Sequence, residues 1–359
     1  MKYWRGYLVA LIISVASWAL LQFAYSHPVL MDMVYPYMNR LIQTNLAPWS
    51  SGADFCIWQL MILIVGVGTA ASIVLMVLLK WNPIQWFGWV MAAVAVLSFF
   101  GTGLQRINQY TGSIADDMRF KDDNCSVLSV EDAAEYYLKH AQAVSAKAGT
   151  MGYDLDELNA KAPDGFKTLT YRERYAIFAG STLPVKKLGW SSRYTKQGIT
   201  GITIYATGES AVNMETPQAL LPYAICREMC IRMSIAREPD VDFAAILACI
   251  YNEDPRFQYA GYLMAYIQCL DGLNGLNTDK SKAAIERLER APGEIINADL
   301  SLWRGFTQNR EKGDTAATLL TNWHIHTVVL PQEALKNAED EAIFDPMDEN
   351  HPNLVGIVS

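Results

Sequence analysis

The sequence lacks the short motifs of several common enzyme classes. It contains no P-loop, no dinucleotide-binding fingerprint and no GxSxG elbow. Their absence excludes the standard nucleotide-binding and serine-hydrolase sites. The chain is also short of cysteine, with 6 in 359 residues. Because that number falls well below the density of a disulfide scaffold, we expect buried free thiols in apolar helices.

Charge is scarce in the N-terminal third. Residues 1–104 contain four of the 29 Lys and Arg residues and two of the 37 Asp and Glu residues. In place of charge there are three nearly uncharged apolar runs, at residues 6–25, 55–79 and 86–104. Each has roughly the 20 residues that a helix needs to cross a bilayer. The sequence therefore predicts a membrane domain over residues 1–105, with three transmembrane helices and the lipid bilayer as a partner.

The few basic residues in this third predict its orientation. Lys2 and Arg5 precede the first run and Lys80 follows the second, whereas the loop expected at 26–54 has a single basic residue. Cytoplasmic loops are enriched in Lys and Arg, so we expect a multi-pass cell-membrane protein with a cytoplasmic N-terminus and an extracytoplasmic C-terminal domain. A cleaved signal peptide is the alternative for the first run. We favour a retained anchor because the apolar part exceeds the usual 7–15 residues.

The remainder of the chain is acidic. It holds 25 basic against 35 acidic residues, a net charge of −10. Such a domain is a poor partner for nucleic acid. Residues 106–337 are long enough to bury one sizeable core. The last segment, 338–359, is acidic and contains proline, which is typical of a loose tail.

Helical patterns dominate residues 106–337. A short antiparallel sheet is expected within 184–213, where β-branched and aromatic residues at 199–205 are punctuated by glycine. The fold class is therefore an α+β, mostly helical domain with one small antiparallel sheet. The helices are expected at about 129–148, 170–180, 217–234, 238–252, 257–272, 278–290 and 311–326.

One helical segment has the shape of a zinc-peptidase helix without its histidines. In an HExxH helix the two histidines lie at i and i+4, on one face, and the intervening glutamate is the general base. Here Arg227 and Ile231 occupy the histidine positions, and Glu228 occupies the position of the base. Glu238, at the start of the next helix, fits the place of a third ligand.

The segments around this helix resemble a family of multi-pass bacterial membrane proteins of uncharacterised function that carry an extracytoplasmic HExxH, zincin-like domain. The resemblance covers most of the chain and follows one order. Its segments are TGESAVN at 207–213, LP at 221–222, IARE at 235–238, DF at 242–243, LAC at 247–249, RF at 256–257 and YAGY at 259–262.

The resemblance implies a zincin-like, gluzincin-type fold, with Glu228 as a remnant general base and Arg227, Ile231 and Glu238 as remnant metal positions. No metal or other cofactor is expected, because a permanent cation at residue 227 opposes a dication directly. We therefore interpret the chain as a pseudopeptidase with a binding or scaffold role at the cell envelope. The alternatives are an active membrane metallopeptidase that binds zinc through unorthodox ligands, and a purely structural envelope protein.

An extended polypeptide is the expected partner of such a scaffold. It would bind beside the 199–205 edge strand by strand addition, and the adjacent Thr207, Gly208, Glu209 and Asn213 are candidate peptide-binding residues. In place of the metal, we expect the Arg227 guanidinium to pair with Glu238, with Glu228 as a second partner.

Three other readings stay open at this stage. The 227–238 region could be an ordinary amphipathic helix. Cys226 and Cys230 also lie at i and i+4, and thiolates bind zinc well, but the shift of one residue turns this pair about 100° around the helix. His324 and His326 form the only closely spaced histidine pair, and both imidazoles share a face only on a strand.

Overall fold

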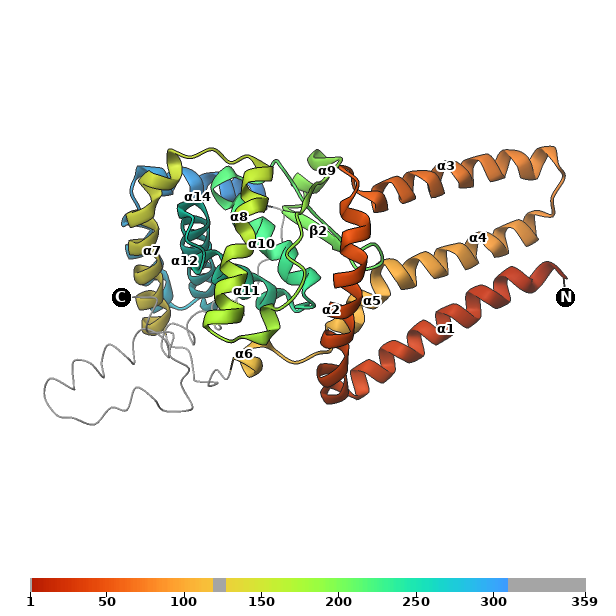
Figure 1. Cartoon of the computed structure of the whole chain (residues 1–359), viewed down its shortest axis with the longest axis horizontal. Coiled ribbons are helices and arrows are strands. Elements are labelled where there is room, and N and C mark those ends of the chain that lie inside the picture. Colours follow the sequence, from red (N-terminus) through yellow and green to blue (C-terminus); the bar gives the residue numbers. More distant parts are fainter. Residues whose placement is uncertain (1, 119–126, 309–359) are drawn as a thin grey trace, which may run out of the picture.

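Three long apolar helices project together from one end of a mostly helical domain (Figure 1). The structure, a computed structural model, describes residues 2–118 and 127–308. The candidate spans are α1 (Arg5–Ser26), α3 (Ile57–Leu78) and α4 (Pro83–Ser98), and α4 continues through a π-helical turn at Phe99–Gly103 into α5 (Leu104–Asn108). All three are long and apolar enough to cross a membrane. The expected spans are therefore present, within a few residues of their expected ends.

The spans α1 and α4 pack against each other through glycine. A Cβ atom built on Gly6 would lie 2.4 Å from the backbone carbon of Gly88, so the two backbones touch where neither residue has a side chain. Small residues allow this approach in lipid, where helix association depends on close packing. The glycines of α3, Gly66 and Gly68, have no neighbouring atoms at this distance. The close helix contact thus lies between the first and third spans.

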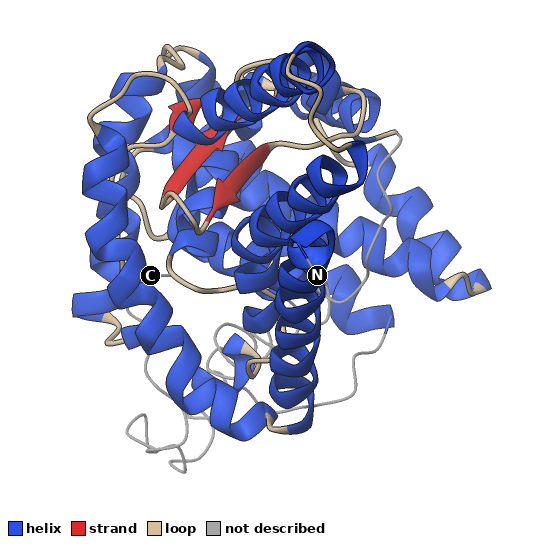
Figure 2. Ribbon diagram, turned by 90° about the vertical axis from the view of Figure 1, so that its right-hand side faces the viewer, coloured by secondary structure: helices blue, strands red, loops and turns tan. Residues whose placement is uncertain are grey.

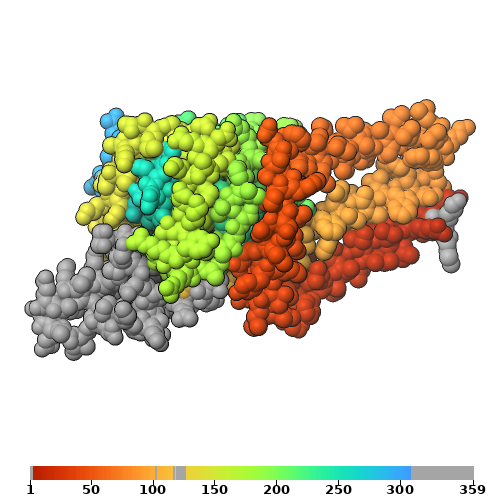
Figure 3. Space-filling model, in the orientation of Figure 1, coloured from red at the N-terminus to blue at the C-terminus, as the bar shows by residue number. Residues whose placement is uncertain are grey.

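The segment expected as a loop at 26–54 is a helix, α2 (Pro28–Ser51), and this part of the prediction is wrong. Pro28 stands at the first helical position, where its missing N–H costs nothing. Figures 1 and 3 show α2 running across the end of the domain from which the three spans project. It also contains Pro36 and Pro48, two residues that are unusual inside a helix.

The domain is built mainly from helices around one core. Before the sheet come the short α6 (Ile114–Asp117), α7 (Val127–Gly149) and α8 (Leu155–Lys167), which ends in a π-helical turn at Thr168–Arg172, followed by a 3-10 turn at Ala176–Phe178. The short α9 (Ser191–Thr195) lies between the first and second strands of the sheet. After the sheet come a 3-10 turn at Gln218–Leu220, then α10 (Leu221–Arg232), α11 (Glu238–Ile250), α12 (Pro255–Leu276), α13 (Asp279–Arg290) and α14 (Glu294–Thr307).

Five of these helices, α7 and α10 to α13, match the expected ranges. The helix expected at 170–180 is replaced by the π-helical and 3-10 turns, and α6, α8, α9 and α14 were not expected. The helix expected at 311–326 and the tail lie outside the described residues. The start of α13 is encoded locally, because Thr278 and Ser281 form a reciprocal capping box.

The sheet has three short strands, β1 (Lys186–Lys187), β2 (Gly201–Ile204) and β3 (Glu209–Val212), in the order β1-β3-β2. β2 pairs antiparallel with β3, but β1 pairs with β3 in parallel. The sheet is therefore mixed, which corrects the expected antiparallel one. It lies near the end of the domain from which the spans project (Figure 2). Because β3 is central, β2 has one free edge.

Candidate functional site

The helix that carries the motif, α10, is the most enclosed element of the domain. Its residues are buried on every side, with Arg227 as the exception, half-buried at the helix surface. It packs against β2, β3, α11 and α12. An ordinary amphipathic helix would expose a polar face, so that reading of the segment is wrong. The side chains of α10 instead face the sheet on one side and α11 on the other.

Arg227 lies at the centre of a cluster of three carboxylates. Its Nη2 donates to Glu238 Oε1 at 3.1 Å, and its Nη1 lies 3.5 Å from Glu228 Oε1. The expected ion pair between Arg227 and Glu238 is therefore present, with Glu228 as the second partner. The shortest contact of Arg227 was not expected. Its Nε donates to Asp242 Oδ1 at 2.7 Å. These negative charges raise the pKa of Arg227 further above its ordinary value.

The sequence contained a signal for this third partner. Asp242 follows Glu238 by four residues, so both lie on one face of α11, a turn apart. Tyr223 precedes Arg227 by four residues, and its hydroxyl donates to the same Asp242 Oδ1 at 2.8 Å. Only 12% of the Arg227 side chain and 8% of the Asp242 side chain are exposed, against 65% for Glu238. Of the pairs that Arg227 makes with α11, the one with Asp242 is consequently the one shielded from water.

Glu228 is fully buried between α10 and the sheet. Thr203 Oγ1, on β2, donates to Glu228 Oε2 at 2.7 Å, whereas Oε1 makes no hydrogen bond. Burial raises the pKa of Glu228 above its ordinary value of 4.5, and the nearby Arg227 and Thr203 oppose that shift only in part. The arrangement therefore holds a carboxyl group whose second oxygen faces Arg227 and is free to accept a hydrogen bond.

Gly201 allows β2 to approach this carboxyl group. A Cβ atom at Gly201 would lie 2.5 Å from Glu228 Cγ and 2.7 Å from the backbone oxygen of Ala211. Because the second neighbour is backbone, it cannot move aside cheaply. Glycine is thus needed here so that the strand edge and the glutamate share one wall.

That wall belongs to an open cleft with a volume of about 550 Å³. One side is formed by the segment 197–204, including the free edge of β2, and the other by residues of α10 and α11. Gln105 and Gln109, where the third span leaves for the domain, complete it. All four residues at the predicted motif positions line this cleft: Arg227, Glu228, Ile231 and Glu238. An open cleft does not match a purely structural protein, for which a filled one was expected.

The four candidate peptide-binding residues do not line the cleft. Asn213 is buried, where its side chain donates to Thr195 Oγ1 and the backbone oxygen of Ile199. Gly208 has a φ of 67° and packs on α2, since a Cβ atom there would lie 2.7 Å from Ala47 N. Thr207 ends the turn after β2, with its hydroxyl 3.5 Å from Ile204 O. These contacts serve the fold, and a peptide-contacting role for the four residues stays a prediction.

Glu209, the fourth of them, joins the sheet to the membrane helices. Its Oε1 accepts the backbone N–H of Ile57 at 2.8 Å, and its Oε2 accepts that of Trp58 at 3.0 Å. Both amides belong to the first turn of α3, where N–H groups lack intrahelical partners and favour a negative charge. Lys186 Nζ lies 2.7 Å from the same carboxylate. The TGE segment therefore caps a span, a role that sequence patterns alone could not reveal.

The four residues at the predicted metal-site positions, Arg227, Glu228, Ile231 and Glu238, do not fit a zinc ion. Catalytic zinc needs three protein ligands and an open position. Here the guanidinium of Arg227 lies within 3.5 Å of both glutamates that would serve the metal, and Ile231 offers no donor atom. Within residues 2–118 and 127–308, no group of three or more His, Cys, Asp and Glu side chains is arranged to hold a metal. The cluster's chemistry is that of a fixed cation among carboxylates.

The other ligand candidates give no site in the described part of the chain. Cys226 and Cys230 are buried free thiols beside Cys249, and burial raises the pKa of Cys230 and Cys249 well above the ordinary value. They face the core, as the expectation of buried thiols requires. His324 and His326 lie outside the described residues.

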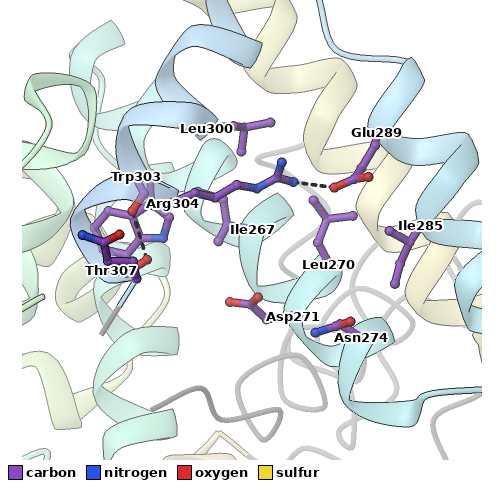
Figure 4. A pocket seen from close by; sticks show the side chains of 11 residues that line it. Ile267, Leu270, Asp271, Asn274, Ile285, Glu289, Leu300, Trp303, Arg304 and Thr307 are labelled. Carbon is purple, nitrogen blue, oxygen red and sulfur yellow. Dashed lines mark hydrogen bonds and ion pairs between the residues drawn. The ribbon is translucent and has the colours of Figure 1, made fainter. Parts of the chain in front are cut away.

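A second cavity of about 360 Å³ lies at the far end of the domain, between α12, α13 and α14 (Figure 4). An ion pair between Arg304 and Glu289 crosses it. Its wall ends at Gln308, the last described residue. It therefore supports no assignment.

The fold and site define a helical domain anchored by three candidate spans, with a cleft between a strand edge and two helices. Within that class the chain belongs to the family described as protein of unknown function (DUF3810), whose profile matches residues 31–318. No curated protein and no solved structure matches the chain. The match covers α2, two spans and the domain together, and it assigns no activity.

Proposed function

We propose that this chain is a membrane-anchored binding protein that holds an extended polypeptide in the cleft beside β2 and does not hydrolyse it. The observation that carries the proposal is the free edge of β2, which forms one wall of an open cleft of about 550 Å³. An exposed strand edge presents unpaired backbone groups that another extended chain can bind.

The register of the sheet identifies the backbone groups available for strand addition. Asn213 N donates to Thr200 O at 2.7 Å, and Gly201 pairs with Val212 in the antiparallel ladder. Because hydrogen-bonded and non-bonded pairs alternate along such a ladder, the N–H and C=O groups of Gly201 and Thr203 point away from β3. They are directed to the cleft, where they supply the donors and acceptors for a bound strand.

The opposite wall gives the cleft its charge. The charged residues of this wall are Arg227, Glu228, Arg237 and Glu238. A bound polypeptide would pair its backbone with β2 and place one hydrogen-bond donor against the carboxylate of Glu238, whose side chain is 65% exposed. This preference for a donor is the specificity that we infer for the site.

We infer that the cleft descends from a zincin-like peptidase site. The i, i+4 placement of Arg227 and Ile231, the adjoining Glu228 and the nearby Glu238 support this descent, as does the antiparallel edge strand beside the helix. Glu228 keeps the place of a general base without a metal to act on. The alternative of an active metallopeptidase draws no support from the cluster, since Arg227 fills the space between the candidate ligands.

The cleft's position restricts what can reach it. Gln105 and Gln109 line the cleft, and they lie in and directly after the helix that continues the third span. A bound polypeptide would therefore lie beside the membrane surface, outside the cytoplasm if the positive-inside bias of Lys2, Arg5 and Lys80 sets the orientation. We propose envelope proteins with extended segments near the bilayer as the partner class.

Binding to an array of unstructured 12-residue peptides tests the proposal, with the full chain in lipid nanodiscs. Ala236 lines the cleft and is not one of the charged residues of the Arg227 cluster, so Ala236→Trp should fill the cleft and abolish binding. Ala283→Trp is the matched control, because Ala283 is exposed on α13, away from the cleft. Absence of peptide binding, or binding that survives Ala236→Trp, would contradict the proposal.

A further inference from the structure

The helix α2 has an inverted distribution of polar and apolar side chains. Its buried stripe, facing the domain, is formed by Tyr35, Asn39, Gln43, Ala47 and Ser50. From residue 30 to residue 41 the opposite face is exposed and apolar, with at least one apolar side chain on each turn. That face consists of Leu30, Val34, Tyr37, Met38 and Leu41, which are 43–66% exposed. A helix in contact with water alone would place these two sets the other way round.

The polar stripe holds α2 tightly on the domain. Asn39 Nδ2 donates to Ser234 Oγ at 3.1 Å, and Gln43 Nε2 donates to Tyr205 O at 3.0 Å. These two amide donors are buried, and each finds an acceptor in the domain. The polar residues of α2 are thus used for internal docking, which leaves the apolar ones outside.

Both charged residues of α2 also turn to the rest of the chain. Asp32 Oδ1 accepts the backbone N–H of Gly112 at 2.9 Å, and Arg40 Nη1 donates to Ala176 O at 2.9 Å. The exposed stripe itself carries no charge. An uncharged apolar stripe of this length, on a monomer's surface, marks an interaction site.

The connections of α2 fix its direction relative to the spans. A single residue, His27, separates it from α1, and residues 52–56 separate it from α3. Both spans project from the domain to the same side (Figures 1 and 3). The two ends of α2 therefore lie at one level, where the spans begin and end. A helix of 24 residues, about 36 Å long, is held across that level at both ends.

We propose that α2 is an in-plane membrane helix whose exposed stripe contacts the acyl chains of the bilayer surrounding the spans. The domain covers the buried face of α2, so the exposed stripe faces the side on which the spans lie. Lipid is continuous with the surfaces of α1 and α3 on that side, whereas a protein partner would have to enter the bilayer to reach the stripe. Helices with such a stripe lie at the boundary of head groups and acyl chains.

Site-directed spin labelling of the full chain in phosphatidylcholine–phosphatidylglycerol nanodiscs tests this proposal. The five described cysteines are buried, so labels can be placed in a Cys125→Ser background at Val34→Cys and Leu41→Cys. Ile64→Cys, 60% exposed on α3, reports lipid, and Lys139→Cys, exposed on α7 at the end of the domain away from the spans, reports water.

We expect collisions with oxygen to exceed those with a water-soluble nickel chelate at residues 34 and 41, as at residue 64, with the reverse at residue 139. Quenching of bimane on the same cysteines by lipids brominated in the acyl chain gives a second readout, and it should reach residues 34 and 41. Collision rates at both residues that match residue 139 would overturn the proposal. Shielding from both reagents would also overturn it, since it would show that protein covers the stripe.

Discussion

The Oε1 atom of Glu209 accepts the backbone N–H of Ile57 at 2.8 Å, so that a carboxylate of the central strand caps a candidate membrane span. Lys186 completes the contact, donating to Glu209 and to the backbone oxygens of Ser50 and Phe55 at 2.7–2.9 Å. Gln59 and Gly189 exchange two hydrogen bonds beside it. The sheet and the first turn of α3 therefore form one rigid connection.

Removing either charge of this connection should leave the other buried and unpaired. The Glu209 side chain is 0% exposed and that of Lys186 10%, so Glu209→Ala and Lys186→Met should each cost about 3–5 kcal/mol of unfolding free energy. The double variant should cost less than the two together. Urea unfolding of the detergent-solubilised chain measures this, with Glu215→Ala, an exposed site, as a control within about 0.5 kcal/mol. Additive costs would contradict the coupling.

Arg227 should stabilise the cleft through its shielded partner. Arg227→Met leaves Asp242 buried without its cation, and we expect a loss of about 3–5 kcal/mol. Adding Asp242→Asn should recover part of that loss. Arg237→Met is the matched control, because its side chain is 42% exposed and lies 3.8 Å from Asp240, so its cost should stay under about 1 kcal/mol. Equal costs for the two arginines would count against the cluster's role.

The buried Glu228 should make stability depend on pH. Its pKa in the folded chain is raised above 4.5, so between pH 4.5 and that raised value the folded chain binds more protons than the unfolded one. Stability therefore falls as pH rises through this window. Glu228→Gln removes that dependence: it should match the parent chain near pH 4 and exceed its stability increasingly above pH 4.5. Unfolding measured across this range checks the sign, and a variant that loses stability as pH rises would contradict it.

Restoring two histidines should restore a metal site if the descent that we propose is correct. Arg227→His with Ile231→His places two imidazoles at i and i+4 beside Glu238, and Asp242 stands where it can accept the N–H of the first imidazole. We expect about one zinc ion per chain of the double variant by elemental analysis, and none for the parent chain.

The control for this experiment adds Glu238→Gln to the double variant, which should lose the metal with the third ligand. A double variant without zinc would remove the main support for descent from a peptidase. Stoichiometric zinc in the parent chain, lost on Glu238→Ala, would instead favour an active metallopeptidase.

Residue patterns predicted the spans because a bilayer imposes one requirement, length without charge, on every residue of a crossing helix. The contact of Arg227 with Glu238 was also predicted, because both residues occupy ligand positions of the zinc-peptidase pattern and carry opposite charges. The helix α2 escaped prediction because its polar stripe is buried and its apolar stripe exposed, so the usual inference from polarity to exposure fails there. The strand β1 has only two residues and shows no strand pattern in the sequence. It forms through its parallel pairing with β3, which lies far along the chain.

The capping of α3 by Glu209 sets an order of events during biosynthesis. The ribosome delivers the first spans and α2 well before residue 209, and N-terminal segments of a chain generally fold first. The amide groups of Ile57 and Trp58 are therefore already placed at the membrane when the central strand emerges. The sheet then assembles on a template supplied by the inserted anchor, and residues 106–308 made without that anchor would have no template on which to close.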